Sequence, residues 1–512
     1  MNKFIAALNK EDLRNAYTEN GAVTFSSTGS ANLDFFALAS AKRGQFNQVV
    51  DLFIRALHED EDLAVRNIFY LRDVRQGQGE RDLFRACLAT LILMDTDHDR
   101  ISKNFLELVP EYGRWDDLIY MFGFNHRISV MISEILSEQL ERDIEDMNNN
   151  RPCSLLAKWF PLENNTRNKN KRVLAKTLRN FIFTDARSAR KIISKLRNYI
   201  DVLERKISSK EYGRIEYKNV PSKAAMLYRK AFLKHDTERY KEYIESLKKG
   251  ETTINASVTY PYEIIRAYRI NACGKVQNDF LGWNYILADH LKYKDETLEL
   301  IWKNLPDYTG ANKKAICVVD VSGSMMGGKD IIPMDVAISL GMYFAERNVG
   351  PFKDHFITFS TYPHLIRIKG ETLLEKVYKM SREDWDGSTD IQEVFNLVLN
   401  AAKRNKLSQE DMPETIYIIS DMEFNHCCDN YTNYELITKK YEEAGYKKPN
   451  IVFWNVASRN TNVPVTKDES GTILVSGCSP SIFKSVISGQ TPEKFMLEIL
   501  NGPRYNFISL DV

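Results

Sequence analysis

The stretch Ala315-Ile-Cys-Val-Val-Asp-Val-Ser-Gly-Ser324 decides the fold of the second half of this chain of 512 residues. Its apolar first half predicts a buried strand, and a polar loop follows at once. The strand therefore places the Asp320 carboxylate at its carboxyl end, next to the hydroxyls of Ser322 and Ser324. The glycine between the serines permits a tight turn. We expect these three oxygen-bearing side chains to lie together at one edge of a sheet.

Two later segments bring further oxygen-bearing side chains to comparable places. Thr389 ends the loop Trp385-Asp-Gly-Ser-Thr389 ahead of a predicted helix, and Asp421 follows the apolar strand 415–419. Carboxylate and hydroxyl oxygens are the ligands that Mg²⁺ and Mn²⁺ prefer in proteins. The alternative is that these side chains only cap the helices that follow them and bind no cation. The pattern predicts one divalent cation, Mg²⁺ or Mn²⁺, held by Asp320, Ser322, Ser324, Thr389 and Asp421.

The sequence around these loops predicts an α/β domain over residues 306–512. Short β-branched runs alternate with helical stretches, which is typical of a doubly wound parallel sheet with crossover helices. The expected strands are 315–319, 355–359, 364–368, 415–419, 451–456 and 472–475, and the expected helices are 335–347, 391–402, 433–444 and 492–500. Sheets of this kind bind ligands at the carboxyl ends of their strands, which is where the two aspartates are expected.

Residues 1–305 have a different pattern, in which apolar residues recur at spacings of three and four and strand alternation is almost absent. Phe53, Ile54 and Leu57 are one example. Turn-forming residues divide this region into helices of about 10 to 20 residues, without a strict repeat. We therefore expect an irregular HEAT-like α-helical array ahead of the α/β domain.

The residues of the metal loops, in this order and on these elements, resemble the metal-ion-dependent adhesion site of von Willebrand A-type domains. The resemblance covers residues 306–512. It implies that Ser322, Ser324 and Thr389 coordinate the cation directly, while Asp320 and Asp421 act mainly through bound water. It also implies that the carboxylate of a partner protein completes the octahedron.

Four phrases in the helical region contain more special residues than ordinary helices need: Leu71-Arg-Asp-Val-Arg-Gln-Gly-Gln-Gly-Glu-Arg81, Tyr112-Gly-Arg-Trp-Asp-Asp117, Ser154-Leu-Leu-Ala-Lys-Trp-Phe-Pro161 and Val220-Pro-Ser222. Their order, followed by the A-type domain, is similar to that of TROVE-module proteins, the group that contains the Ro autoantigen. It is more similar still to their bacterial, plant and viral relatives. The resemblance implies a ring of HEAT-like helices closed by the A-type domain. Ends of single-stranded RNA would enter its hole, and small structured RNAs would bind its basic outer surface.

Residues within these phrases also have plain structural interpretations. Arg72, Arg75 and Arg81 surround two glycines, where they form either a phosphate-binding loop or, as we favour, a helix–helix turn with nearby acids. Trp115 and Trp159 either stack on bases or belong to the core, and we favour the core. No individual RNA contact is therefore assigned from these phrases.

Positive charge is concentrated in the middle of a nearly neutral chain. The formal net charge is +1, yet residues 151–250 contain 26 Lys and Arg against 10 Asp and Glu, a net +16. Such a block indicates an anionic partner, and the alternative is a solvated helical face rich in lysine. Its apolar residues Val173, Leu174, Leu178 and Ile182 are expected to form the buried stripe. The candidates for RNA contact are Arg167, Lys169, Lys171, Arg172, Lys176, Arg179, Arg187, Arg190 and Lys191.

We expect a cytoplasmic protein that is a monomer and has no membrane partner. No window approaches the roughly 20 consecutive apolar residues that cross a bilayer, and the first thirty residues lack a secretory pattern. The seven cysteines are odd in number and scattered, which is typical of a reducing compartment rather than of a disulfide framework or a zinc site.

The favoured function is an RNA-binding scaffold of the Ro type, which binds small or misfolded RNA through basic helices and holds Mg²⁺ or Mn²⁺ in its A-type domain. The alternative is a metal-dependent protein-interaction module that binds no nucleic acid. RNA that co-purifies at low salt and is lost at high salt would favour the first. We expect no catalysis, because the metal loops contain no partnered general base; Glu423, two residues past Asp421, is the nearest candidate.

Overall fold

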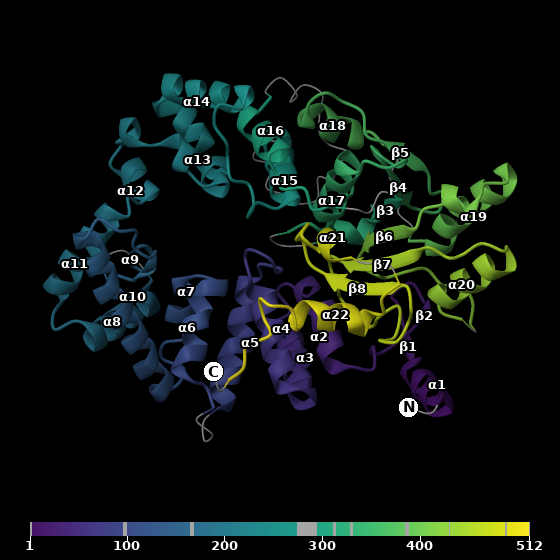
Figure 1. Ribbon diagram of the computed structural model, residues 1–512, viewed down its shortest axis with the longest axis horizontal. Helices are drawn as coiled ribbons and strands as arrows, with labels where there is room; N and C mark the ends of the chain where they lie inside the picture. The colour runs from purple at the N-terminus through teal and green to yellow at the C-terminus, as the bar shows by residue number, and fades with distance from the viewer. Residues whose placement is uncertain are drawn as a thin grey trace. The chain divides into compact units, whose positions relative to one another are not determined.

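The computed structural model describes residues 3–95, 100–163, 168–273, 294–310, 314–327, 331–383, 389–429, 431–486 and 489–510. Within these residues a helical N-terminal region is followed by a largely parallel sheet with helices, which confirms the expected fold class (Figure 1). None of the helices in these ranges combines the length and the apolar character needed to cross a membrane.

The large sheet contains six strands in the order β5-β4-β3-β6-β7-β8. Neighbouring strands are parallel except β4 and β5, whose short connection cannot form the crossover that a parallel pair requires. All residues of β3, β6 and β8 are buried, so both faces of the sheet are covered. The strands are β3 (Ala315–Asp320), β4 (His355–Phe359), β5 (Leu365–Arg367), β6 (Thr415–Ser420), β7 (Asn450–Asn455) and β8 (Thr472–Ser476).

Helix α17 (Pro333–Arg347) packs on β3, β4 and β6. Its approach to β3 requires a glycine, because a Cβ atom on Gly341 would lie 2.4 Å from Val319 Cγ2. This contact supports the strand that ends at Asp320. The other helices of this part are α18 (Leu373–Met380), α19 (Ile391–Asn405), α20 (Asn433–Glu443), α21 (Ile482–Ser485) and α22 (Pro492–Leu500).

The start of the chain packs on the same sheet. Helix α2 (Ala31–Leu38) contacts the edge strand β8, and Ser40 Oγ lies 2.9 Å from Ser476 Oγ. A short hairpin of β1 (Ala16–Tyr17) and β2 (Val23–Thr24) precedes α2. The sequence did not predict this hairpin, because strands of two residues have no detectable alternation.

The expected boundary at residues 305/306 marks the change from helices to the α/β fold, while spatial contacts divide the chain into two compact units. The first unit consists of Met1–Asp60, Pro221–Arg229 and Glu242–Gly502. The second unit consists of Glu61–Val220, Lys230–Lys241 and Pro503–Val512. The N-terminal segment therefore belongs with the sheet rather than with the helices that follow it.

Most of the chain before residue 305 is helical, as its apolar spacing predicts. Apart from α2, the helices are α1 (Lys3–Leu13), α3 (Phe46–Glu59), α4 (Glu61–Arg72), α5 (Arg81–Met94), α6 (Lys103–Tyr112), α7 (Trp115–Tyr120), α8 (His126–Asn148), α9 (Leu156–Trp159), α10 (Lys169–Ile182), α11 (Ala186–Tyr199), α12 (Leu203–Ser208), α13 (Ser222–His235), α14 (Thr237–Lys249), α15 (Pro261–Cys273) and α16 (Glu296–Lys303).

The arginine-rich phrase between α4 and α5 has a structural role in the second unit. Arg72 is buried and donates from Nε and Nη2 to Asp117 Oδ2 at 2.9 and 2.7 Å. The exposed Arg81 pairs with its neighbour Asp82 at 2.9 Å. The favoured interpretation, a turn whose arginines pair with acids, agrees with these contacts, although the acid that holds Arg72 comes from α7.

Candidate metal centre and basic surface

The carboxyl ends of β3 and β6 lie side by side and bring the first candidate ligands together. The two strands pair in parallel through Val319 and Ile419, one residue before each strand ends. The buried Asp320 carboxylate accepts from Ser420 Oγ at 2.6 Å and from the Ser322 backbone N–H at 2.9 Å. Asp320 is thus fixed by both strand ends.

A chain of hydroxyl contacts leads from this aspartate to the next one. Ser322 Oγ lies 2.9 Å from Ser324 Oγ, and Ser324 Oγ donates to Asp421 Oδ2 at 2.7 Å. The structure therefore gathers Asp320, Ser322, Ser324 and Asp421 into one cluster. We refer to these four residues as the oxygen cluster.

Thr389 is hydrogen-bonded to the loop after β6. Its hydroxyl donates to the Glu423 backbone carbonyl at 2.8 Å and lies 3.1 Å from Asn425 Oδ1. Within the described ranges, no hydrogen bond joins Thr389 to the oxygen cluster. The next residue, Asp390, caps α19 by accepting from two backbone N–H groups. The preceding loop, residues 384–388, lies outside the described residues.

Three residues that the sequence analysis did not assign to the centre, Arg459, Glu19 and Asn20, surround these ligands. Arg459 Nη2 donates to Asp421 Oδ2 at 2.9 Å and to Glu19 Oε2 at 3.0 Å. Asn20 Nδ2 donates to Thr389 Oγ1 at 2.8 Å and to the Glu423 carbonyl at 2.6 Å. Because that carbonyl can only accept, it fixes the orientation of the Asn20 amide.

Of these residues, only Arg459 had a signal in the sequence. It follows the predicted strand 451–456, so the rule that ligands meet at the carboxyl ends of parallel strands applies to it. Glu19 and Asn20 belong to the short hairpin, and nothing in their spacing relates them to a loop some 370 to 440 residues later in the chain.

The centre holds more buried negative charge than its own residues neutralise. Burial, together with the nearby Asp421 carboxylate, raises the pKa of Asp320 to about 7, against hydrogen bonds from Ser420 and Ser322 that lower it. Burial also raises the pKa of Glu423, although the Glu19 backbone N–H and Asn460 donate to its carboxylate. A further cation would relieve this repulsion.

The donors of the oxygen cluster are hard oxygens, as Mg²⁺ and Mn²⁺ require. Among the described residues, no three His, Cys, Asp or Glu side chains form a group that could hold a metal ion. A cation at this place therefore depends on the serine hydroxyls as well as on the two carboxylates.

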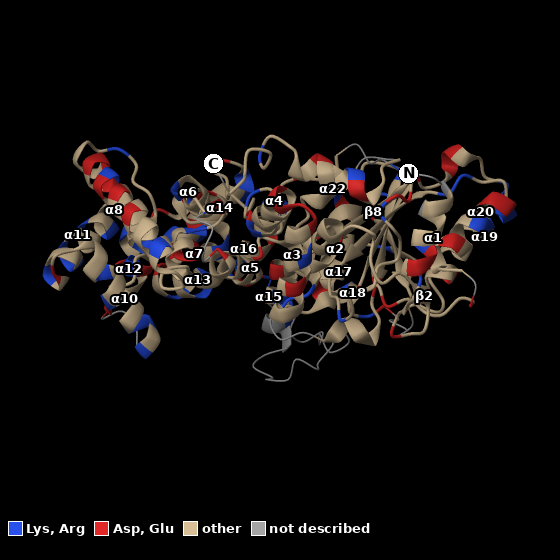
Figure 2. Cartoon of the chain, turned by 90° about the horizontal axis from the view of Figure 1, so that it is seen from below, with Lys and Arg blue, Asp and Glu red and all other residues tan. Residues whose placement is uncertain are grey.

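The second candidate site is the basic surface of α10 and α11 (Figure 2). Most of its predicted residues are exposed: Lys169, Lys171, Arg172, Lys176, Arg187, Arg190 and Lys191. Arg179 is an exception, because its side chain is 15% exposed and donates to Glu163 at 2.8 Å. Arg167 lies outside the described residues.

The buried stripe of α10 differs from the expected one. Ala175 and Leu178 are buried, whereas Val173 is 65% exposed and Leu174 and Ile182 are half-buried. Val173 lies two residues from Ala175, which is about half a helical turn, so the two side chains leave opposite faces. The expectation that Val173 is buried was therefore wrong.

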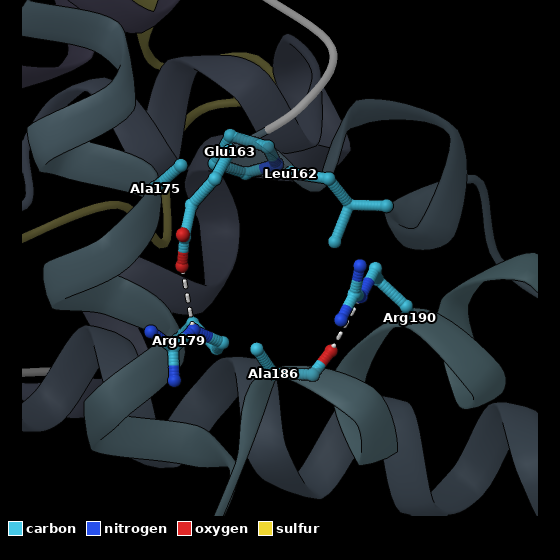
Figure 3. Close-up of a pocket in the computed structure, with 7 residues that line it drawn as sticks. Leu162, Glu163, Ala175, Arg179, Ala186 and Arg190 are labelled. Atoms are coloured by element: carbon cyan, nitrogen blue, oxygen red, sulfur yellow. Dashed lines mark hydrogen bonds and ion pairs between the residues drawn. The ribbon is translucent and has the colours of Figure 1, made fainter.

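A small cavity of about 90 Å³ lies between the two helices (Figure 3). Arg179 and Arg190 line it together with Glu163 and Leu162. Arg190 Nε donates to the Ala186 backbone carbonyl at 3.0 Å, and the Arg179–Glu163 ion pair closes another side. Arg179 is thus held by a residue that precedes α10, and Arg190 is held by a carbonyl of its own helix.

Two family models match this chain. Residues 314–498 match a domain of unknown function, DUF7788, which contains the oxygen cluster. Residues 18–100 and 168–308 match a second domain of unknown function, DUF2828, which includes most of the hairpin and the basic helices. An uncharacterised protein of Acanthamoeba polyphaga mimivirus is 30% identical over 524 residues, which cover 95% of this chain and 87% of the relative.

Proposed function

This chain belongs to the same family as the mimivirus protein, and we propose that it is an RNA-binding scaffold whose α/β part holds a divalent cation. Two separate observations support the two halves of this proposal. The oxygen cluster supports the cation, and the exposed basic residues of α10 and α11 support the nucleic acid. We link the two halves through the resemblance of the sequence to the Ro proteins of the TROVE group.

The oxygen cluster is the observation that carries the cation site. The side-chain oxygens of Ser322, Ser324 and Asp421 form a hydrogen-bonded row at the ends of adjacent parallel strands, and Asp320 accepts from the Ser322 backbone N–H. A divalent ion would bind the same hard oxygens and offset two buried carboxylates. The strand order and the place of the cluster favour a von Willebrand A-type domain, in which Ser322 and Ser324 bind directly and Asp320 and Asp421 bind through water. A bound ion would offer its open position to the carboxylate of a partner protein.

Mn²⁺ or Mg²⁺ should raise the thermal unfolding temperature of the chain, and Asp320→Asn should abolish this effect. A hundredfold excess of ion over its dissociation constant corresponds to about 2.7 kcal/mol of stabilisation. The measurement is thermal unfolding with the ion and with a chelator. Asp390→Asn is the matched control, since asparagine caps a helix as well as aspartate does. Equal shifts in the wild type and Asp320→Asn would contradict the assignment.

We propose that this centre binds and does not catalyse. Glu423 is the nearest carboxylate that could serve as a base, and both its oxygens are engaged. Oε2 accepts from the Glu19 backbone N–H at 2.6 Å and Oε1 accepts from Asn460 Nδ2 at 3.1 Å. A carboxylate held in this way helps to position the hairpin, and we expect it not to act as a base.

Exposed basic side chains on two adjacent helices are the observation that favours RNA. Lys169, Lys176, Arg187 and Lys191 are exposed, and no ion pair joins them to a carboxylate in the part of the chain that the structure describes. Arg187 and Lys191 lie four residues apart and share a stripe of α11. Such charges bind phosphates by releasing counterions. The resemblance of the sequence to Ro proteins is our reason for proposing RNA as the anion.

Replacing Lys169, Lys176, Arg187 and Lys191 by glutamine should weaken RNA binding and its salt dependence. Each phosphate contact with a single strand contributes about −0.7 to the slope of log K against log salt, so four lost contacts reduce the slope by about 2.8. The four side chains are exposed, so the unfolding temperature should barely change. Sequence preference should also persist, since phosphate contacts do not read bases. Filter binding of a single-stranded RNA across a salt series measures both quantities.

A second variant with the same change in net charge controls for non-specific electrostatics. Lys103, Arg151, Lys158 and Arg214 lie in the same compact unit, and each pairs with a carboxylate. Their replacement by glutamine should reduce the slope much less. If both variants bind as the wild type does, the basic surface is only solvated. A metal-dependent protein-interaction module without nucleic acid then becomes the better proposal.

A further inference from the structure

The turn between β1 and β2 is fixed against the loop that follows β6. Thr18 Oγ1 donates to the Phe424 carbonyl at 2.7 Å, and the His426 backbone N–H donates to the Asn20 carbonyl at 3.2 Å. Gly21, with φ of 80°, makes the turn and forms a bridge with Asn425. The hairpin tip therefore has a defined position beside the oxygen cluster.

In this arrangement Arg459 pairs with two carboxylates, one buried and one exposed to solvent. A single nitrogen, Arg459 Nη2, lies 2.9 Å from Asp421 Oδ2 and 3.0 Å from Glu19 Oε2. The Asp421 side chain is 2% exposed, whereas that of Glu19 is 43% exposed and that of Arg459 is 41% exposed. The guanidinium thus lies at the mouth of the centre, with its outer partner in water.

Asp421 Oδ2 accepts hydrogen bonds from two donors. It accepts from Arg459 on one side and from Ser324 Oγ on the other. A divalent ion bound next to Ser324 would attract this oxygen and repel the guanidinium a few ångströms away. Glu19 would still hold the arginine as an exposed ion pair, at little cost in stability.

We propose that Arg459 is a displaceable counter-cation, which neutralises Asp421 when no divalent ion is bound and keeps only its pair with Glu19 when one binds. The inference rests on the proposed cation site and adds residues that regulate it. Glu19 and Arg459 then form an exchange pair that sets how tightly the centre holds its ion. The N-terminal hairpin contributes to the centre through this pair, although it lies far away in sequence.

The first test measures Mn²⁺ binding to the full chain by isothermal titration, with the free Mn²⁺ signal in electron paramagnetic resonance as a second readout. Arg459→Gln removes the competing charge and should tighten Mn²⁺ binding about threefold, which lies within the range of an exposed ion pair. Arg459→Lys keeps the charge and should remain within about twofold of the wild type. Because both readouts report occupancy, neither depends on any activity.

A double-mutant cycle separates displacement from a general effect of charge. Glu19→Gln deprives the departing Arg459 of its outer partner and should weaken Mn²⁺ binding about threefold in the wild-type background. In the Arg459→Gln background the same change should have almost no effect, since no guanidinium remains to be received. If Glu19 acts only as a distant negative charge, its replacement weakens binding equally in both backgrounds, and the proposal is overturned.

The possible outcomes separate failure of the Arg459 displacement from failure of the proposed cation site. A wild-type chain that binds no Mn²⁺ overturns the cation site itself. A wild-type chain that binds Mn²⁺ while Arg459→Gln binds equally or less tightly leaves the site intact and overturns the displacement. Should Arg459→Gln fold poorly without the ion, its unfolding temperature at saturating Mn²⁺ should still approach that of the wild type. A deficit that persists at saturation indicates a structural role and also overturns the proposal.

Discussion

Replacing Asp117 with alanine should lower the free energy of unfolding of the second compact unit by about 3–5 kcal/mol, as expected when one partner of a buried ion pair is removed. Asp117 is completely buried, and it accepts from Arg72 at 2.9 and 2.7 Å and from Arg85 at 2.7 Å. Without the carboxylate, Arg72 keeps its charge in a site where it is 2% exposed. A buried guanidinium that loses its partner carries the full cost of its desolvation.

Hydrogen exchange is the appropriate measurement, because a chain of two compact units need not unfold in one step. The slowest amides of α4, α5 and α7 should lose most of their protection in Asp117→Ala. Asp82→Ala is the control: the Arg81–Asp82 pair is 44% and 60% exposed, so its loss should cost less than about 1 kcal/mol. Comparable losses of protection in both variants would show that the buried network is not what stabilises these helices.

The fold could be predicted where a single periodicity dominates. The apolar runs that became β3 and β6 are buried on both faces, and an uninterrupted apolar run is the pattern of such a strand. The β1–β2 hairpin escaped prediction because each strand has two residues. Its place beside the oxygen cluster depends on contacts between residues hundreds of positions apart, and no local pattern records them.

The part of the candidate site that lies at strand ends could also be predicted from the sequence. Asp320, Ser322, Ser324 and Asp421 could be associated because parallel strands place their carboxyl ends together. The charge pattern of α10 was less informative, since composition cannot tell an exposed lysine from a paired arginine. Arg179 has its partner, Glu163, sixteen residues earlier, a spacing that belongs to no helical stripe.

Removing one partner of the buried ion pair between α15 and α17 should strongly lower the free energy of unfolding. Arg269 of α15 donates from Nε and Nη2 to the carboxylate of Asp335 on α17, at distances of 3.0 to 3.2 Å. Asp335 is fully buried and Arg269 is nearly so. Arg269→Met should therefore cost about 3–5 kcal/mol, because the aspartate remains charged or takes up a proton without its bidentate partner.

Replacing both partners should lower the stability far less than replacing one. Arg269→Met with Asp335→Leu removes both charges and keeps similar volumes, and such replacements are often neutral or stabilising. We expect the double variant to regain most of the protection that the single variant loses in the amides of α15 and α17, measured by hydrogen exchange. A double variant as unstable as Arg269→Met would mean that the pair specifies the packing of α15 on α17 through its geometry. Helix α17 supports β3, so Mn²⁺ binding should recover together with the protection.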